Sequence, residues 1–228
     1  ASLVGTATVS AINGVATFTD LRIDKTGTGY TLTASSGSLS SAVSSSFDVS
    51  SAAASTLVVI SEPSTTAAGE AFGTQPVVQI PDAYGNVITS SSASVTASIT
   101  PNTGAAGSTL SGSTTVNTTN GVATFSGLSI DKAGSGYTLT LSSTGLTSAV
   151  TSEFSILSAS ASALAFSVQP QGGTAGDTSA LNSTVVITDN LGNVVTDASS
   201  DITVAITSVS GLDQNPDGEN RMRAMSTT

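Results

Sequence analysis

The chain has 228 residues, a formal net charge of −10 and a pI near 4.1, and only 9% of its residues are charged. Its five basic residues form no basic patch of the kind that binds nucleic acid, so we expect no nucleic-acid partner. The absence of cysteine and histidine excludes disulfides, zinc sites of the usual ligand types and histidine-assisted nucleophiles. Mean hydropathy is positive and no apolar run reaches about 18 residues, which argues against disorder and predicts no membrane span.

A long segment of the chain occurs twice. Residues 13–35 read NGVATFTDLRIDKTGTGYTLTAS and residues 120–142 read NGVATFSGLSIDKAGSGYTLTLS, with 17 of 23 positions identical. The same offset of 107 residues relates further positions, which are Phe47 and Phe154, Pro63 and Pro170, Asp82 and Asp189, and Ser94 and Asp201. A constant offset without gaps predicts one repeating domain.

The offset divides the chain into four parts. Residues 55–161 make one complete repeat. Residues 1–54 match only the second half of a repeat, and residues 162–211 match only the first half. We call these two parts the N-terminal and the C-terminal half-repeat. Residues 212–228 form a tail of different composition.

Strands in the complete repeat are predicted from alternating apolar residues and from turn residues. In chain order the expected strands are STLVVIS, QPVVQI, ASVTASI, the two arms of GSTTVNTTNGVATFSGL, GYTLTLSS and AVTSEFSIL. Asn120 and Gly121 lie between the two arms and suit a hairpin turn whose central residues both have positive φ. About seven short strands without a helical pattern predict an all-β fold, in which tandem antiparallel sandwiches have an immunoglobulin-like arrangement.

Tyr137 opens a late strand directly after a turn rich in Asp and Gly. That position is typical of a tyrosine corner, in which the phenol hydroxyl bonds to the backbone a few residues upstream. Tyr30 repeats it in the N-terminal half-repeat. Stacking of these rings on a ligand is the alternative, but a residue that recurs at one place in each repeat favours a structural role.

The combined pattern QP…TAG…V.I.D..GNVVT…NGVATFS.LSIDKAG.GYTLT…S.F.I resembles the tandem bacterial immunoglobulin-like (Big-type) repeats of large surface proteins. Examples are the stalk domains of invasin- and intimin-like adhesins. The resemblance covers residues 1 to about 211. It implies an extracellular, cell-surface setting and a stalk or filament of stacked sandwiches. Since the family has no catalytic residues to carry over, we expect no enzyme activity.

The half-repeats would each leave apolar strand residues in water if they stood alone. Burying one such side chain contributes roughly 1.5–3 kcal/mol. The two half-repeats are complementary, so head-to-tail joining of copies would complete a sandwich at each junction and give an open filament. We therefore expect other copies of the same chain as partners. The alternative is that this sequence is a window on a longer protein with many repeats.

An adhesin that binds a glycan or a host surface protein is the second class of function. Such a site would need a cluster of exposed aromatic residues. The chain has no tryptophan, and Tyr84 is the one exposed candidate that the sequence offers.

Two turns carry oxygen ligands. In the tail, Asp213, Asn215 and Asp217 precede Gly218 with the spacing of the opening of a calcium loop, but position 12 of that loop is Ala224. A polar turn is the alternative, and we expect no other cofactor. The bends DAYGN from Asp82 and DNLGN from Asp189 are explained as turns capped by their own side chains, with an inter-domain calcium site on Asp82 and Glu62 or Glu70 as the alternative.

Overall fold

The computed structural model describes residues 1–174, 181–206, 212–214 and 220–222, and the chain forms two compact units, Ala1–Thr196 and Asp197–Thr228. Every regular element in these described residues is a β-strand, and all strand pairs but one are antiparallel. The predicted all-β class is confirmed. None of the described segments forms a helix of the length and apolarity that crossing a membrane requires.

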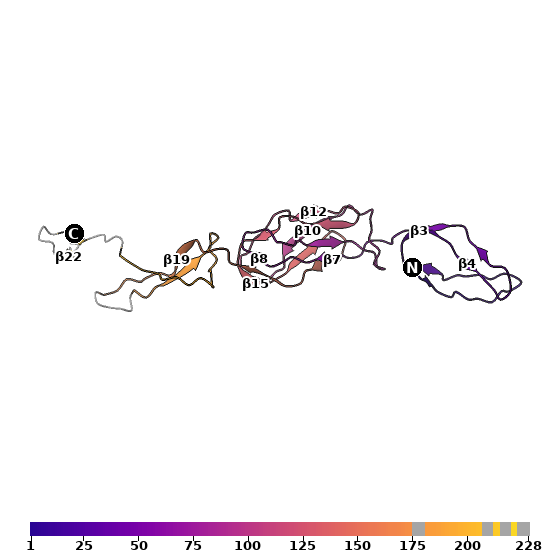
Figure 1. Cartoon of the computed structure of the whole chain (residues 1–228), viewed down its shortest axis with the longest axis horizontal. Coiled ribbons are helices and arrows are strands. Elements are labelled where there is room, and N and C mark those ends of the chain that lie inside the picture. The colour runs from indigo at the N-terminus through magenta and orange to yellow at the C-terminus, as the bar shows by residue number, and fades with distance from the viewer. Residues whose placement is uncertain (175–180, 207–211, 215–219, 223–228) are drawn as a thin grey trace, which may run out of the picture. The chain divides into compact units, whose positions relative to one another are not determined.

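The N-terminal half-repeat contains six short strands (Figure 1), which are β1 (Leu3–Val4), β2 (Arg22–Ile23), β3 (Gly27–Tyr30), β4 (Thr33–Ala34), β5 (Ala42–Val43) and β6 (Phe47–Val49). They form three separate antiparallel pairs, β1 with β2, β3 with β6, and β4 with β5. Most of their side chains are exposed or half-buried.

The complete repeat contains twelve strands, which are β7 (Val58–Ser61), β8 (Thr66–Ala67), β9 (Val77–Gln79), β10 (Ser94–Ile99), β11 (Leu110–Ser111), β12 (Thr115–Asn117), β13 (Val122–Thr124), β14 (Ser129–Ile130), β15 (Gly134–Tyr137), β16 (Leu139–Ser142), β17 (Ala149–Val150) and β18 (Phe154–Leu157). They form four sheets, in the orders β12-β10-β16-β17, β13-β9-β7, β15-β18-β8 and β11-β14. The pair β18-β8 is parallel.

Buried and exposed side chains alternate along the strands, and the buried ones form the core of the complete repeat. In β10, Val95 and Ala97 are buried whereas Ser94, Thr96 and Ser98 are exposed. The same pattern in the other sheets joins into one apolar cluster, whose members all lie between Leu57 and Ile156. The sheets therefore face one another across a single core.

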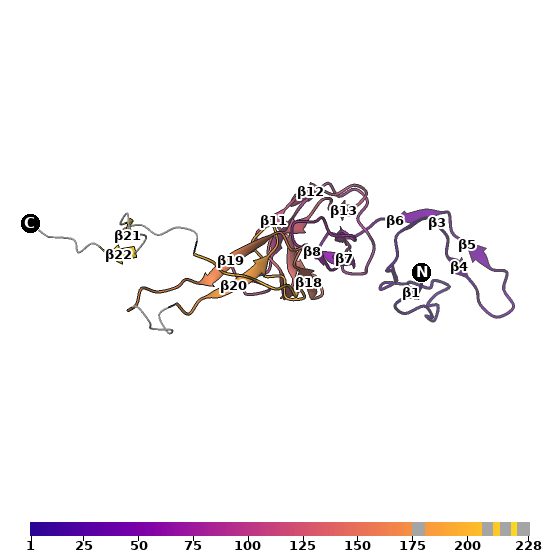
Figure 2. The ribbon, with the colours of Figure 1, turned by 60° about the vertical axis from the view of Figure 1, so that its left-hand side comes forward.

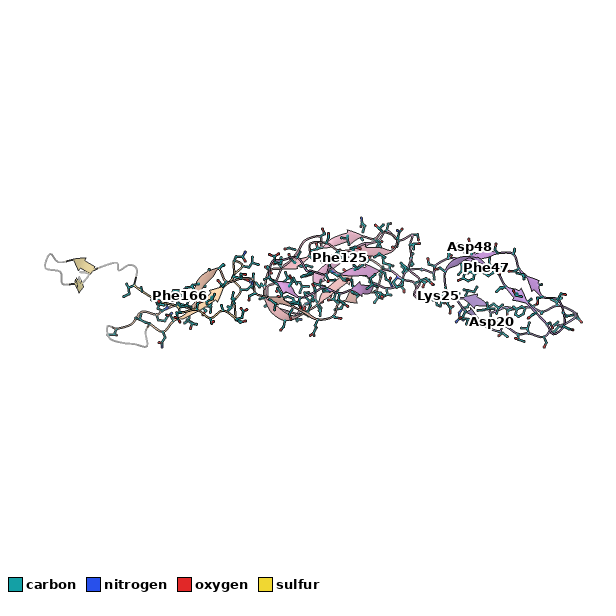
Figure 3. The ribbon with its side chains drawn as sticks, in the orientation of Figure 1. Asp20, Lys25, Phe47, Asp48, Phe125 and Phe166 are labelled. Carbon is teal, nitrogen blue, oxygen red and sulfur yellow. The ribbon has the colours of Figure 1, made fainter. Side chains whose placement is uncertain are left out.

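Aromatic rings fill the centre of this cluster. Phe125, which Figure 3 labels among the strands of the complete repeat, has only 1% of its surface exposed. The rings of Phe72 and Phe154 meet edge to face at 5.4 Å, and Tyr137 lies 5.9 Å from Phe154. Such pairs contribute beyond the area that they bury.

The long hairpin predicted over residues 112–128 is wrong beyond its turn. Asn120 and Gly121 both have positive φ, 52° and 75°, and Thr119 and Val122 exchange backbone hydrogen bonds across them. However, β12 pairs with β10 while β13 pairs with β9, so the two arms enter different sheets. The turn therefore carries the chain from the sheet that contains β10 to the sheet that contains β9, and both arms have residues that face the core.

The C-terminal half-repeat contributes one antiparallel pair, β19 (Ala163–Val168) and β20 (Thr184–Thr188), which Figure 2 shows side by side. Every side chain of β19 is exposed. In the second unit, β21 (Leu212–Gln214) pairs with β22 (Asn220–Met222). Asp213 of the predicted calcium loop lies on β21, whereas Asn215 and Asp217 lie outside the described residues.

Candidate functional site

The turn Asp82–Asn86, directly after β9, is closed by its own backbone and by the Asp82 carboxylate. The N–H of Asp82 donates to the carbonyl of Asn86 (2.9 Å), and the N–H of Gly85 donates to the carbonyl of Asp82 (3.1 Å). Oδ1 of Asp82 accepts from the N–H groups of Tyr84 and Asn86, both at 2.9 Å. Gly85 has φ 77°, the conformation that glycine adopts at least cost.

The second carboxylate oxygen of Asp82 accepts a hydrogen bond from a residue outside the turn. Oδ2 accepts from the backbone N–H of Ala52, which precedes the complete repeat, at 2.9 Å. It also accepts from Nδ2 of Asn86 at 2.9 Å. Asp82 is therefore buried, with 3% of its surface exposed, yet fully bonded. The Asn86 amide, with the backbone N–H groups of Asn86, Ala52 and Tyr84, holds the pKa of Asp82 well below its usual range in spite of burial.

Asn86 connects the complete repeat to the N-terminal half-repeat. Its Nδ2 donates to the carbonyl of Asp24 (2.8 Å), and its Oδ1 accepts from the N–H of Thr26 (3.2 Å). Between them, Nζ of Lys25 donates to the carbonyl of Tyr84 (2.9 Å). Three successive residues of the sequence IDKT are thus bonded to one turn about 60 residues further along the chain.

The same arrangement recurs 107 residues later, at the junction between the complete repeat and the C-terminal half-repeat. Oδ1 of Asp189 accepts from the N–H groups of Leu191 and Asn193, and Oδ2 accepts from Ala159 N–H (3.0 Å). Nδ2 of Asn193 donates to the carbonyl of Asp131 (3.0 Å). Its Oδ1 accepts from the N–H of Ala133 (3.0 Å). Each of these partners is the repeat equivalent of a partner at the first junction.

We call these two sites the first and the second clamp. The first clamp consists of Asp82 and Asn86 with their partners Asp24, Thr26 and Ala52, and the second clamp consists of Asp189 and Asn193 with their partners Asp131, Ala133 and Ala159. The sequence predicts local capping for both turns, with calcium as the alternative at Asp82, but it does not predict their bonds to the preceding repeat. The signal was present, because the DxxGN turns and the IDK segments recur with the same offset.

The pKa of Asp189 in the second clamp results from two opposing effects, burial and hydrogen bonding. Burial raises its pKa, but the Asn193 amide and the N–H groups of Ala159, Asn193 and Leu191 outweigh burial, so the pKa of Asp189 lies below its ordinary value of 3.8. The carboxylate therefore stays ionised and acts only as an acceptor. Both clamps join a buried anion to neutral donors.

The clamps do not have the donor set of a cation site. Both oxygens of Asp82 are occupied by N–H donors, and the Glu62 carboxylate instead accepts from Ser152 N–H (3.0 Å). Throughout the part of the chain that the structure describes, no group of three or more acidic residues is placed to hold a metal ion. The inter-domain calcium alternative therefore does not fit these residues.

The two repeated tyrosines bond to the same backbone segments as the clamp asparagines. Oη of Tyr137 donates to the carbonyl of Lys132 (2.8 Å), and Oη of Tyr30 donates to the carbonyl of Lys25 (3.2 Å). Each of these lysines lies between the two residues that the clamp asparagine binds. Tyr137 has no exposed surface, so its ring is out of reach for ligand stacking.

Neither a protein-family model nor a curated protein sequence matches this chain. Among the solved structures that match are two crystal structures of β-glucuronidase from Parabacteroides merdae, one of them with glycerol in the active site. They are 18% and 17% identical over 53% and 51% of this chain, with TM-scores of 0.33 and 0.32. The matched part spans only 14% and 15% of those chains, and likenesses of this size carry no argument about function.

Proposed function

We propose that the protein is an extracellular structural element, a cell-surface stalk or filament built head to tail from immunoglobulin-like sandwiches. The observation that carries this proposal is that the bonds of the clamp aspartate and asparagine to the preceding repeat recur at both ends of the complete repeat. A binding module needs its joints only to present a site, whereas a spacer needs every joint to hold the same geometry. The half-repeats are then completed by neighbouring chains or repeats.

The chemistry of the clamps suits a load-bearing joint. Each clamp asparagine donates to one backbone carbonyl and accepts from one backbone N–H, so it fixes both the position and the orientation of the IDK segment. Since the carboxylates bind neutral N–H groups, the joint is less sensitive to salt than an exposed ion pair would be.

An adhesin that binds a glycan or a host surface protein is the alternative function. It is favoured by Tyr84, whose side chain is half exposed at the tip of the first DxxGN turn. Glycan-array binding separates the two functions. A stalk should bind no glycan, whereas an adhesin should lose its binding when Tyr84 is changed to Ala.

Joint stiffness tests the stalk directly. The chain has no cysteine, so spin labels can be attached at Ser98→Cys in β10 and Ala165→Cys in β19, both exposed positions on either side of the second clamp. We expect one narrow label–label distance distribution in the otherwise unaltered chain, and a clearly broader one after Asn193→Ala.

The matched control is Asn190→Ala. Asn190 is an exposed residue of the same turn, and its repeat equivalent is already alanine, Ala83. This change should leave the distribution narrow. A broad distribution in the unaltered chain would contradict the proposed spacer, because its joints would then not hold the two neighbouring parts at a fixed distance.

A further inference from the structure

One peptide group of the complete repeat is hydrogen-bonded at both of its ends. Its carbonyl belongs to Lys132 and accepts from Oη of Tyr137 at 2.8 Å. Its N–H belongs to Ala133 and donates to Oδ1 of Asn193 at 3.0 Å. A trans peptide group is planar, and its carbonyl and its N–H point in opposite directions. The phenol and the clamp asparagine therefore hold opposite sides of one rigid unit.

The first clamp has the same arrangement. Oη of Tyr30 donates to the carbonyl of Lys25, which Figure 3 labels, at 3.2 Å. The N–H of the same peptide group belongs to Thr26 and donates to Oδ1 of Asn86, also at 3.2 Å. At both junctions, a single peptide group thus lies between the tyrosine hydroxyl and the clamp asparagine.

The hydroxyl of Tyr137 is fixed in position by the packing around its ring. Tyr137 belongs to the core cluster and has no exposed surface, and a Cβ at Gly104 would overlap its ring. The phenol oxygen is also hydrogen-bonded to Oγ of Ser108 (2.7 Å). In a close-packed interior, such a ring cannot change its rotamer without displacing its neighbours. The hydroxyl is therefore a fixed point from which the Lys132 carbonyl is held.

Other bonds hold the beginning of the same segment to the complete repeat. The carbonyl of Ile130 accepts from the N–H of Gly69 (2.8 Å), and Oδ1 of Asp131 accepts from the N–H of Thr109 (2.7 Å). Tyr137 holds the other end of the segment. The IDK segment is therefore fixed from inside its own repeat before the next repeat binds it.

We propose that Tyr137 is a positioning residue of the second clamp, and that Tyr30 has the same role in the first clamp. The phenol holds the peptide group after the lysine in the orientation in which its N–H meets the clamp asparagine. Each joint is then connected, through one peptide group, to the tyrosine of the preceding repeat. The inference deepens the proposed function and rests on it in one respect, that the clamps are the joints of the stalk. The competing role is a tyrosine corner that stabilises only its own turn.

Tyr137→Phe tests the positioning role, because it removes the hydroxyl and keeps the ring. Hydrogen exchange of the full chain in heavy water, followed amide by amide by NMR, measures the result. The N–H of Ala133, which donates to Asn193, should exchange faster in the variant by about tenfold or more. The N–H of Ala159 should accelerate with it by a similar factor.

Ala159 separates positioning of the clamp from stabilisation of the tyrosine's own turn. Its N–H donates to Oδ2 of Asp189, the same oxygen that accepts from Nδ2 of Asn193 (2.9 Å). Loss of the Asn193 geometry should therefore reach Ale159 only through the clamp. A variant that accelerates exchange at Ala133 and leaves Ala159 unchanged would overturn the inference.

Ile80 is the internal reference for the stability of the core. Its N–H donates to the carbonyl of Gly121 (2.9 Å), and its side chain is fully buried. Exchange at Ile80 should change little in Tyr137→Phe. Acceleration at Ile80 as large as at the clamp would mean a general loss of stability and would also overturn the inference.

Ser108→Ala is the matched control. It removes the other hydrogen bond of the same phenol and leaves the bond from Tyr137 to Lys132 in place. Exchange at Ala133 and at Ala159 should therefore stay as in the unaltered chain. An acceleration as large as that in Tyr137→Phe would assign the effect to the surroundings of the ring and would contradict the positioning role.

Tyr30→Phe keeps the inference testable if Tyr137→Phe unfolds the complete repeat, since Tyr30 lies outside the core cluster. Here the N–H groups of Thr26 and Ala52, which donate to Asn86 and Asp82, should exchange about tenfold faster. The amides of the second clamp should keep their rates. Unchanged exchange at both Thr26 and Ala52 would overturn the inference.

The unaltered chain separates failure of this inference from failure of the proposed function. If Ala133 and Ala159 exchange there as fast as exposed amides, no clamp exists in solution, and the proposed joint fails together with the inference. If both amides are protected in the unaltered chain and remain equally protected in Tyr137→Phe, the joint stands and only the positioning role fails.

Discussion

The side-chain amide of Asn86 donates to the carbonyl of Asp24 at 2.8 Å, and Asn193 repeats the contact on Asp131 at 3.0 Å. One hydrogen bond of this kind is worth about 1 kcal/mol, but an unpaired buried partner costs about 1–3 kcal/mol. The main cost of losing this contact therefore comes from the backbone carbonyl that would be left without a hydrogen bond, and less from the strength of the bond itself.

Asn86→Ala should release the amide of Thr26 from protection. Oδ1 of Asn86 accepts from this N–H, which would have no side-chain acceptor in the variant. Hydrogen exchange at Thr26 should accelerate by about tenfold or more, as a local loss of about 1.4 kcal/mol would give. Exchange at Val78 in the core strand β9 should change little, and equal acceleration at both sites would mean that the variant unfolds as a whole.

Acid should weaken both clamps. The pKa values of Asp82 and Asp189 are lowered in the folded chain from the ordinary value of 3.8. A lowered pKa contributes stability that is fully present above the unfolded value and is lost as pH falls through the folded value. Thermal unfolding midpoints should hold between about pH 7 and 5 and decline below about pH 4.

Asp82→Asn tests the origin of that decline. This variant has an amide nitrogen where the clamp needs an acceptor, so it should be less stable at neutral pH and show a flatter acid dependence. Asp197→Asn, a change at an exposed carboxylate, is the control and should keep the full decline. An unchanged acid dependence in Asp82→Asn would assign the decline to other groups.

Phe125→Ala and Phe18→Ala should differ greatly in cost although the two positions are equivalent. Phe125 is almost fully buried, so its truncation should cost about 3–5 kcal/mol in the free energy of unfolding. Phe18 is 43% exposed, and its truncation in dilute chain should cost about 1 kcal/mol or less. Urea denaturation of the two variants measures both values, and equal costs would mean that Phe18 is covered in solution.

Gly104→Ala should destabilise the complete repeat through Tyr137. Gly104 has φ 66°, and a Cβ there would overlap the Tyr137 ring. Gly127 is the matched control, because it has φ 65° and open space around the same position. The backbone conformation alone should cost each alanine variant about 1–2 kcal/mol. Overlap should add about 1–3 kcal/mol in Gly104→Ala only, measurable as a lower Tm. Equal Tm values would contradict the close approach.

How far the sequence predicts the site is clearest at Tyr137 and Asp82. The turn before Tyr137 led to an expected bond from its hydroxyl to the upstream backbone, and the structure has Lys132 as the acceptor. The side chain of Asp82 was expected to cap its own turn, which it does through Tyr84 and Asn86. Its bond to Ala52, and the bond of Asn86 to Asp24, join segments about 30 and 60 residues apart, which no local pattern reveals.

The sequence by itself determined the repeat, the all-β class and the positions of most strands, because alternation and turn residues act over a few neighbouring positions. Only the tertiary structure decided where strands go after a turn. The Asn120–Gly121 turn is the same locally whether its arms pair with each other or, as here, with β10 and β9 in different sheets. Partner choice depends on which apolar faces can be buried together, and burial depends on the whole fold. For the same reason Phe18 and Phe125 share a sequence context and differ in their surroundings.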